Sequence, residues 1–284
     1  MNKRSDSSVD MQEKNLFRQA LGCLMLETPD VKMACAAALY RAWCAGELDT
    51  AAAPAPRRVT VPGRPRKPEL VHPGKVPKRG FHSRNGLLGL AHAIAHIEFN
   101  AINLALDAVY RFRGMSDDYY TDWLRVAAEE ARHFALLESY LQTHGSYYGA
   151  FAAHNGLWEM ALKTDHDVML RMALVPRVLE ARGLDVTPGM IVKLRDVNEQ
   201  ALVDILEVIY REEIGHVLAG TRWFNHVCAQ RGLVPAETFR RLLHEHMHGV
   251  LRGPFDISSR LQAGFSEAEL RDLAAFDQAE KAYA

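Results

Sequence analysis

A repeated pattern of glutamate and histidine constrains this chain of 284 residues more than any other feature. Each copy has one glutamate, followed 32 or 33 residues later by a Glu-x-x-His motif within the segments EEARH and EEIGH. A lone Glu-x-x-His motif often arises by chance, but repetition of the whole pattern at an offset of 82 or 83 residues is improbable. The six residues are Glu98, Glu130 and His133 in the first copy, and Glu180, Glu213 and His216 in the second.

The chain after residue 86 is predicted to be helical almost throughout. Apolar residues recur at steps of three and four along residues 87–112, 117–143, 154–182 and 189–231. The expected ends of these helices are marked by Gly114, Gly145, Gly183 followed by Pro188, and Gly232 followed by Pro235. No stretch alternates for long enough to predict a strand. We therefore expect an all-α fold built on a four-helix bundle.

The bundle is expected to span residues 86–232, with three further segments around it. Residues 1–50 are predicted to form an N-terminal helical segment with helices at 16–27 and 29–48. Residues 51–85 read as a proline-rich basic strap, because residues 51–80 hold seven of the twelve prolines. Residues 233–284 are expected to pack on the bundle as C-terminal helices, the last opened by a capping box of Ser266 and Glu269.

The basic strap has two interpretations. Between Arg57 and Arg79 it carries eight Arg or Lys residues and one acidic residue, Glu69. These cations could contact the phosphates of RNA, in which case binding should weaken steeply with salt. The alternative, which the absence of interleaved aromatic residues favours, is a strap attached to the bundle by salt bridges.

Bulk properties indicate a cytoplasmic protein without membrane contact. The net charge of −1 and the pI near 6.9 argue against a chain that is basic as a whole. The longest apolar stretch, residues 31–43, is too short for a bilayer, which needs about 20 residues. The N-terminus lacks the apolar centre of a signal peptide, and the four scattered cysteines are expected to be free thiols.

The six patterned residues are predicted to face one core and to bind two metal ions. Glu98, for example, shares a helical face with Ile94 and Ile102. Four buried carboxylates would be very costly if left uncompensated, whereas two divalent cations balance their charge and two imidazoles complete the ligand set. One Glu from each of two helices, with Glu-x-x-His from each of the other two, is the ligand set of dinuclear carboxylate bundles. Such donors suit iron, with manganese as the alternative.

Two further glutamates, Glu129 and Glu212, immediately precede the motif glutamates. We expect each to accept the ring N–H of the opposing histidine and so to set its tautomer. This hypothesis pairs Glu212 with His133 and Glu129 with His216. The alternative is that both are ordinary solvent-exposed helix residues.

With these motifs the sequence resembles the ferritin-like di-iron carboxylate superfamily. The segments HAIAHIEFNAINLALDAVYRF and RGPFDISSRLQAGF also resemble an uncharacterised bacterial ferritin-like family. That likeness runs from Arg57 to the C-terminal tail. Its relatives include the di-iron tRNA hydroxylases, which share the Glu-Ala-Arg of residues 180–182. The resemblance implies a ferritin-like bundle with extra N-terminal and C-terminal helices.

The resemblance also implies a role for each ligand. Glu130 and Glu213 would bridge two iron ions, Glu98 and His133 would complete one of them, and Glu180 and His216 the other. The acidic residue before each motif resembles oxygen-activating members more than simple iron stores. Radical-generating reductase subunits have a tyrosine four residues after the first motif histidine. Here that position is Leu137, which argues against a stable tyrosyl radical.

The function expected from these features is oxygen-dependent oxidation or hydroxylation of an organic substrate, with tRNA as one candidate. A separate electron donor is expected, because no nucleotide-binding glycine motif is present. One alternative is manganese-dependent removal of peroxide, and another is non-catalytic iron binding, ferroxidase activity or storage. Storage predicts a large closed shell of subunits, whereas a hydroxylase predicts a small oligomer such as a homodimer.

Overall fold

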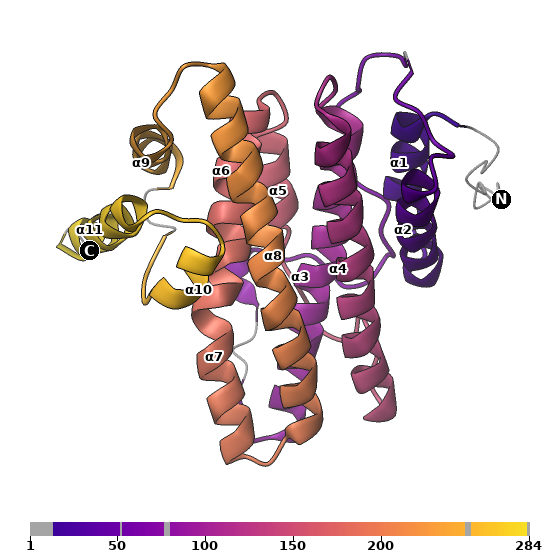
Figure 1. Cartoon of the computed structure of the whole chain (residues 1–284). Coiled ribbons are helices and arrows are strands. Elements are labelled where there is room, and N and C mark those ends of the chain that lie inside the picture. Colours follow the sequence, from indigo (N-terminus) through magenta and orange to yellow (C-terminus); the bar gives the residue numbers. More distant parts are fainter. Residues whose placement is uncertain (1–13, 52, 77–79, 248–250, 283–284) are drawn as a thin grey trace. The chain divides into compact units, whose positions relative to one another are not determined.

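The computed structural model describes residues 14–51, 53–76, 80–247 and 251–282, with side chains up to residue 278 (Figure 1). Over these residues the regular structure is helical, which confirms the predicted all-α class. The chain divides into two compact units, Met1–Leu162 and Lys163–Ala284. None of the described helices is long and apolar enough to cross a membrane.

Two long helices, α3 (Arg84–Arg111) and α4 (Asp117–Thr143), run side by side in the first unit (Figure 1). The helix α1 (Leu16–Leu24) packs against α3, and α2 (Pro29–Cys44) packs against α4. The short helix α5 (Gly156–Lys163) follows. In the turn between α3 and α4, Gly114 adopts a φ of 75°, which favours glycine over residues with a side chain.

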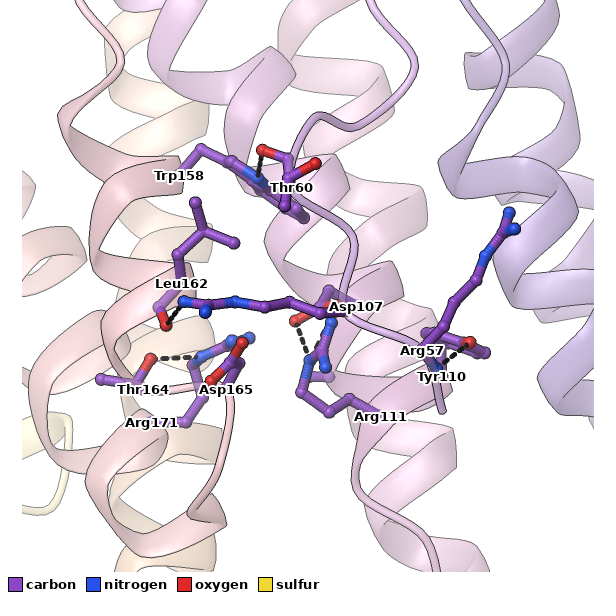
Figure 2. Close-up of polar contacts among 12 residues, drawn as sticks. Arg57, Thr60, Asp107, Tyr110, Arg111, Trp158, Leu162, Thr164, Asp165 and Arg171 are labelled. Atoms are coloured by element: carbon purple, nitrogen blue, oxygen red, sulfur yellow. Dashed lines mark hydrogen bonds and ion pairs between the residues drawn. The ribbon is translucent and has the colours of Figure 1, made fainter. Parts of the chain in front are cut away.

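The strap between α2 and α3 contains one short 3-10 helix, η1 (Pro73–Lys75), and otherwise follows an irregular path. Figure 2 shows two of the hydrogen bonds that hold it. The Arg57 amide donates to the Tyr110 hydroxyl at 2.8 Å, and the Trp158 indole donates to the Thr60 carbonyl at 3.2 Å. Hydrogen bonds between backbone groups of the strap and side chains outside it therefore help to attach the strap. The expected attachment by salt bridges stays a prediction. RNA contact through this segment stays a prediction, and Lys78 and Arg79 lie outside the described residues.

Gly63 brings the strap into close contact with the end of α1. Its amide donates to the Leu24 carbonyl at 3.0 Å, and its carbonyl accepts from the buried Lys32 ammonium at 2.5 Å. A Cβ atom at this position would lie 2.2 Å from the carbonyl carbon of Met25. Since that obstacle is backbone, a side chain could be accommodated only by moving the strap away from α1.

We expect Gly63→Ala to lower the free energy of unfolding by about 1–3 kcal/mol, the usual range for an added methyl group in a packed site. Urea unfolding followed by circular dichroism measures the change. Gly74→Ala in the same strap is the matched control, because its Cβ would lie 3.4 Å from the His72 ring, an ordinary contact. Equal stability of the two variants would contradict the close packing at Gly63.

The second unit contains a segmented helix followed by one long helix. The segments α6 (Val168–Leu174), η2 (Val175–Glu180) and α7 (Ala181–Asp196) follow one another directly, and η2 is a π-helix. The long helix α8 (Gln200–Gln230) packs against all three. The remaining helices are α9 (Pro235–His246), α10 (Ile257–Gln262) and α11 (Glu267–Ala282).

In this unit the helix end predicted at Gly232 and Pro235 is confirmed, because α8 ends at Gln230 and Gly232 adopts a φ of 66°. The end predicted at Gly183 and Pro188 was wrong. Gly183 and Pro188 lie inside α7, and the chain instead breaks at residues 164–167 and 197–199. The first break precedes Asp167, whose carboxylate caps α6 by accepting the Met169 amide at 2.7 Å. Burial of side chains on both sides of Pro188, including Leu184 and Ile191, keeps α7 continuous despite the hydrogen bond that proline cannot make.

The predicted capping box at the start of α11 is confirmed. The Glu269 carboxylate accepts the Ser266 amide at 2.9 Å, and the Ser266 hydroxyl accepts the Glu269 amide at 3.3 Å. The four-helix bundle itself stays a prediction. Each unit supplies one long helical pair, α3 with α4 and α7 with α8, of the kind that such a bundle needs.

Candidate metal centre

In the first unit the structure brings three predicted ligands together. Glu98 lies on α3, and Glu130 and His133 lie one turn apart on α4. The His133 Nδ1 atom is 3.2 Å from Glu98 Oε2 and 3.4 Å from Glu130 Oε2. Each residue offers a ligand atom within 4.8 Å of those of the others. This buried Glu/His group could therefore hold a metal ion.

The group is embedded in the core between α3 and α4. Glu98 is 3% exposed, and Glu130 and His133 are fully buried. Phe99 and Phe134, which directly follow two of the ligands, pack together with ring centroids 5.5 Å apart. Two carboxylates at such depth need a positive partner, because the cost of burying an isolated charge is several kcal/mol.

The pKa values record this conflict between burial and charge. Burial and the neighbouring charge of Glu130 raise the pKa of Glu98 well above its usual range. Burial alone would lower the pKa of His133, but hydrogen bonds and charges from Glu130 and Glu98 outweigh it and raise that pKa to about 11. The two carboxyl groups therefore favour a protonated imidazole at His133. A bound cation would supply the positive charge instead and would need the neutral imidazole.

The second unit repeats part of this arrangement. Glu213 and His216 lie one turn apart on α8, with His216 Nδ1 3.6 Å from Glu213 Oε1. His216 is fully buried and Glu213 is 9% exposed. Glu180, also 9% exposed, is the last residue of the π-helix η2. A single π-helical turn often marks a functional position in a helix.

A glycine lets α8 approach the π-helical segment closely. A Cβ atom on Gly220 would lie 2.4 Å from the Pro176 ring. Gly220 is one helical turn after His216, and Pro176 is four residues before Glu180. The same contact therefore sets the register between the two elements that carry the predicted ligands of this unit.

Within each unit, the structure places the predicted ligands on buried helix faces. The assembly of all six residues into one dinuclear centre stays a prediction. The roles of Glu129 and Glu212 also stay predictions. Glu129 is partly exposed and forms an ion pair with Arg125 at 3.0 Å, so any bond to a histidine would have to compete with this partner.

Sequence reasoning missed Tyr148, which packs beside the first group of ligands. Its hydroxyl lies 2.8 Å from His96 Nδ1, and His96 Nε2 lies 3.0 Å from the His154 carbonyl. Because a carbonyl can only accept, Nε2 donates to it, and Nδ1 then accepts from the Tyr148 hydroxyl. Its ring lies 4.9 Å from that of Phe134. Burial raises the pKa of this phenol. Tyr148 lies in a loop after α4. No helical spacing therefore relates it to the Glu-x-x-His motif, so the sequence pattern gave no signal for it.

Comparisons with known proteins show the family to which the chain belongs. No solved structure matches this chain. An uncharacterized protein of Haemophilus influenzae is 48% identical over 226 residues, which is 77% of this chain and 78% of that relative. The family described as "Protein of unknown function (DUF455)" matches residues 25–271, a range that includes all six predicted ligands. The chain therefore belongs to this family of proteins of unknown function.

Proposed function

We propose that the protein binds a dinuclear metal centre, of iron in the first instance, and uses it for oxygen-dependent oxidation or hydroxylation of an organic substrate. The observation that carries the proposal is the buried group of Glu98, Glu130 and His133, whose ligand atoms lie within 4.8 Å of one another. The equivalent Glu-x-x-His pair in the second unit, Glu213 with His216, supports a second, related half of the centre.

The chemistry of the donor set fits two divalent cations. Each half supplies two carboxylates and one imidazole, donors that suit iron or manganese rather than a metal that seeks thiolates. None of the four cysteines belongs to either half. Glu98, His133, Glu180 and His216 would be terminal ligands, while Glu130 and Glu213 would bridge the ions as the superfamily resemblance implies.

Ferrous ions in such a centre would supply the electrons and the open coordination positions for reaction with dioxygen. The chain's own residues would hold the ions in place and balance their charge. The aromatic and aliphatic side chains around the ligands, Phe99 and Phe134 among them, would limit access of water. A separate electron-donor protein would reduce the iron ions again after each cycle. If the substrate is RNA, the basic strap would bind its phosphates.

Anaerobic titration with ferrous iron tests the proposal. We expect uptake of about two iron ions per chain, as in dinuclear carboxylate bundles, together with a higher melting temperature, because a ligand that binds only the folded state stabilises it. Exposure of the loaded protein to oxygen should then consume oxygen and change its absorbance.

The alternatives predict other outcomes of the same titration. Stable iron binding without oxygen consumption would replace the enzymatic proposal with a storage role, and size-exclusion chromatography would then reveal a large shell. Activity only with manganese and hydrogen peroxide would indicate peroxide removal. Absence of any metal uptake at neutral pH would contradict the dinuclear centre itself.

A further inference from the structure

Two cysteines of the first unit lie together outside the candidate metal centre. Cys23 lies on α1 and is fully buried, whereas Cys35 lies on α2 and is partly exposed. Their thiol groups share a side-chain hydrogen bond, so the two sulfur atoms are neighbours. The Cys23 thiol also lies 3.7 Å from the Lys32 carbonyl, one turn before Cys35 on the same helix.

A buried ammonium group accompanies the two thiols. The Lys32 side chain is fully buried and its Nζ atom donates to three oxygens, those of the Leu24 and Gly63 carbonyls and of the Asn103 side chain. Burial lowers the pKa of Lys32 to about 7. Three oxygen acceptors around Nζ favour the protonated ammonium, which has three N–H donors. In that form its positive charge acts on the Cys35 thiol.

The electrostatics favour a thiolate at the exposed member of the pair. The hydrogen bond from Cys23, aided by the charge of Lys32, outweighs burial and lowers the pKa of Cys35. Burial and the same hydrogen bond raise the pKa of Cys23 well above its usual range. Since the thiolate is the nucleophile, Cys35 is the residue that attacks the oxidant. Cys23 stays a protonated thiol until it reacts with the oxidised Cys35.

We propose that Cys23 and Cys35 form a peroxide-reactive dithiol site, in which Cys35 is oxidised first and Cys23 then closes a reversible disulfide between α1 and α2. The proposal does not depend on the metal centre. Partial exposure of Cys35 gives a small hydroperoxide access to its sulfur, whereas Cys23 is fully buried.

The reaction balances with hydrogen peroxide as the oxidant. The Cys35 thiolate attacks one peroxide oxygen, the O–O bond breaks, and the products are a sulfenic acid on Cys35 and hydroxide, which takes up a proton to become water. The Cys23 sulfur then attacks the Cys35 sulfur, forming the S–S bond and releasing the sulfenic oxygen with two protons as a second water. Two thiols lose two electrons in all, and a dithiol reductant would restore them.

Oxidation of the reduced, full-length protein with one equivalent of hydrogen peroxide tests this site. We expect the intact mass to fall by two hydrogen atoms and a non-reducing digest to contain a peptide that links Cys23 to Cys35. Treatment with a dithiol should remove the link. In Cys23→Ala the reaction should stop at a sulfenic acid on Cys35, which dimedone traps, and the pH midpoint of Cys35 alkylation should move to higher values because the hydrogen-bond donor is lost.

Other cysteines provide the controls. Cys44→Ser removes an exposed thiol from the same helix, and Cys228→Ser removes a buried thiol from the second unit, so both variants should still form the link. Cys35→Ser should lose the link and leave Cys23 unmodified. The proposal would be overturned if Cys23 in Cys35→Ser were oxidised to the same extent as in the wild-type protein. It would also be overturned by a digest of the wild-type protein in which Cys44 is oxidised while Cys23 and Cys35 stay reduced.

Discussion

Replacement of Glu130 by alanine should remove most of the metal that the purified protein can bind. Glu130 is the fully buried carboxylate that contacts His133 at 3.4 Å, and the proposed role gives it contact with both ions. Loss of residues that only support a ligand already weakens metal affinity about 10- to 100-fold. Loss of a bridging ligand should therefore weaken it by at least about 100-fold, so that little iron remains after gel filtration.

The fold should survive this substitution, which separates a metal defect from misfolding. Removal of Glu130 also removes the neighbouring charge that raises the pKa of Glu98, and His133 keeps Glu98 as a partner at 3.2 Å. Circular dichroism and the melting temperature of the metal-free variant should therefore stay close to those of the metal-free wild type. Metal content is measured by elemental analysis of the same samples.

Two further variants complete the experiment. Glu138→Ala, on the same helix but only half buried and outside the group, is the matched control and should retain full metal content. Glu213→Ala tests the second unit and should behave like Glu130→Ala. If Glu130→Ala and Glu213→Ala both retained full metal content, their assignment as bridging ligands would be wrong.

Replacement of Arg177 by methionine should cause the largest loss of stability in the second unit. Arg177 is fully buried, and its guanidinium donates to the Glu269 carboxylate at 2.5 Å. Three phenylalanine rings surround it at 4.1–4.6 Å from their centroids, from Phe224, Phe239 and Phe265. Without Arg177, the carboxylate of Glu269 stays buried with its cationic partner gone, which typically costs about 3–5 kcal/mol.

A double-mutant cycle separates the ion pair from the packing. Glu269→Gln keeps an oxygen for the capping box with Ser266 while it removes the charge. The double variant should be destabilised by clearly less than the sum of the two single variants, because neither charge is then left alone. Urea unfolding provides the values.

The control for this cycle is an ion pair of the same type on the surface. Arg195 and Glu207 form a salt bridge at which both side chains are about half exposed, at 55% and 47%. Arg195→Met should therefore change stability by about 1 kcal/mol or less. If Arg177→Met lowered the free energy of unfolding by a similarly small amount, the buried pair of Arg177 and Glu269 would not contribute to stability as expected for a buried charge.

The two units differ in how well local patterns predicted their helices. The predicted limits of α4, residues 117–143, agree with the structure, because two aspartates lie in its first turn and Gly145 adopts a φ of 75° just after it. In α7 the apparent stop signals were overruled by packing against α8, and the true break has Asn198 in the left-handed region. Asparagine tolerates that conformation, but it is a weaker signal than glycine.

The sequence alone determined which residues share a helical turn. Contact between Glu130 and His133, or between Glu213 and His216, follows from a spacing of three within one helix, since neighbouring turns are fixed by local backbone geometry. Helical content and the burial of these faces follow from the same periodicity. The family resemblance added a role for each ligand, and these roles stay predictions.

Only the tertiary structure decided which side chains from separate elements meet. The distance from Glu98 to His133 depends on the register of α3 against α4, and the neighbouring thiols of Cys23 and Cys35 depend on how α1 packs on α2. Such contacts are set by the shapes of many side chains in a close-packed core. No spacing along the chain encodes them, because each partner is selected by packing between helices.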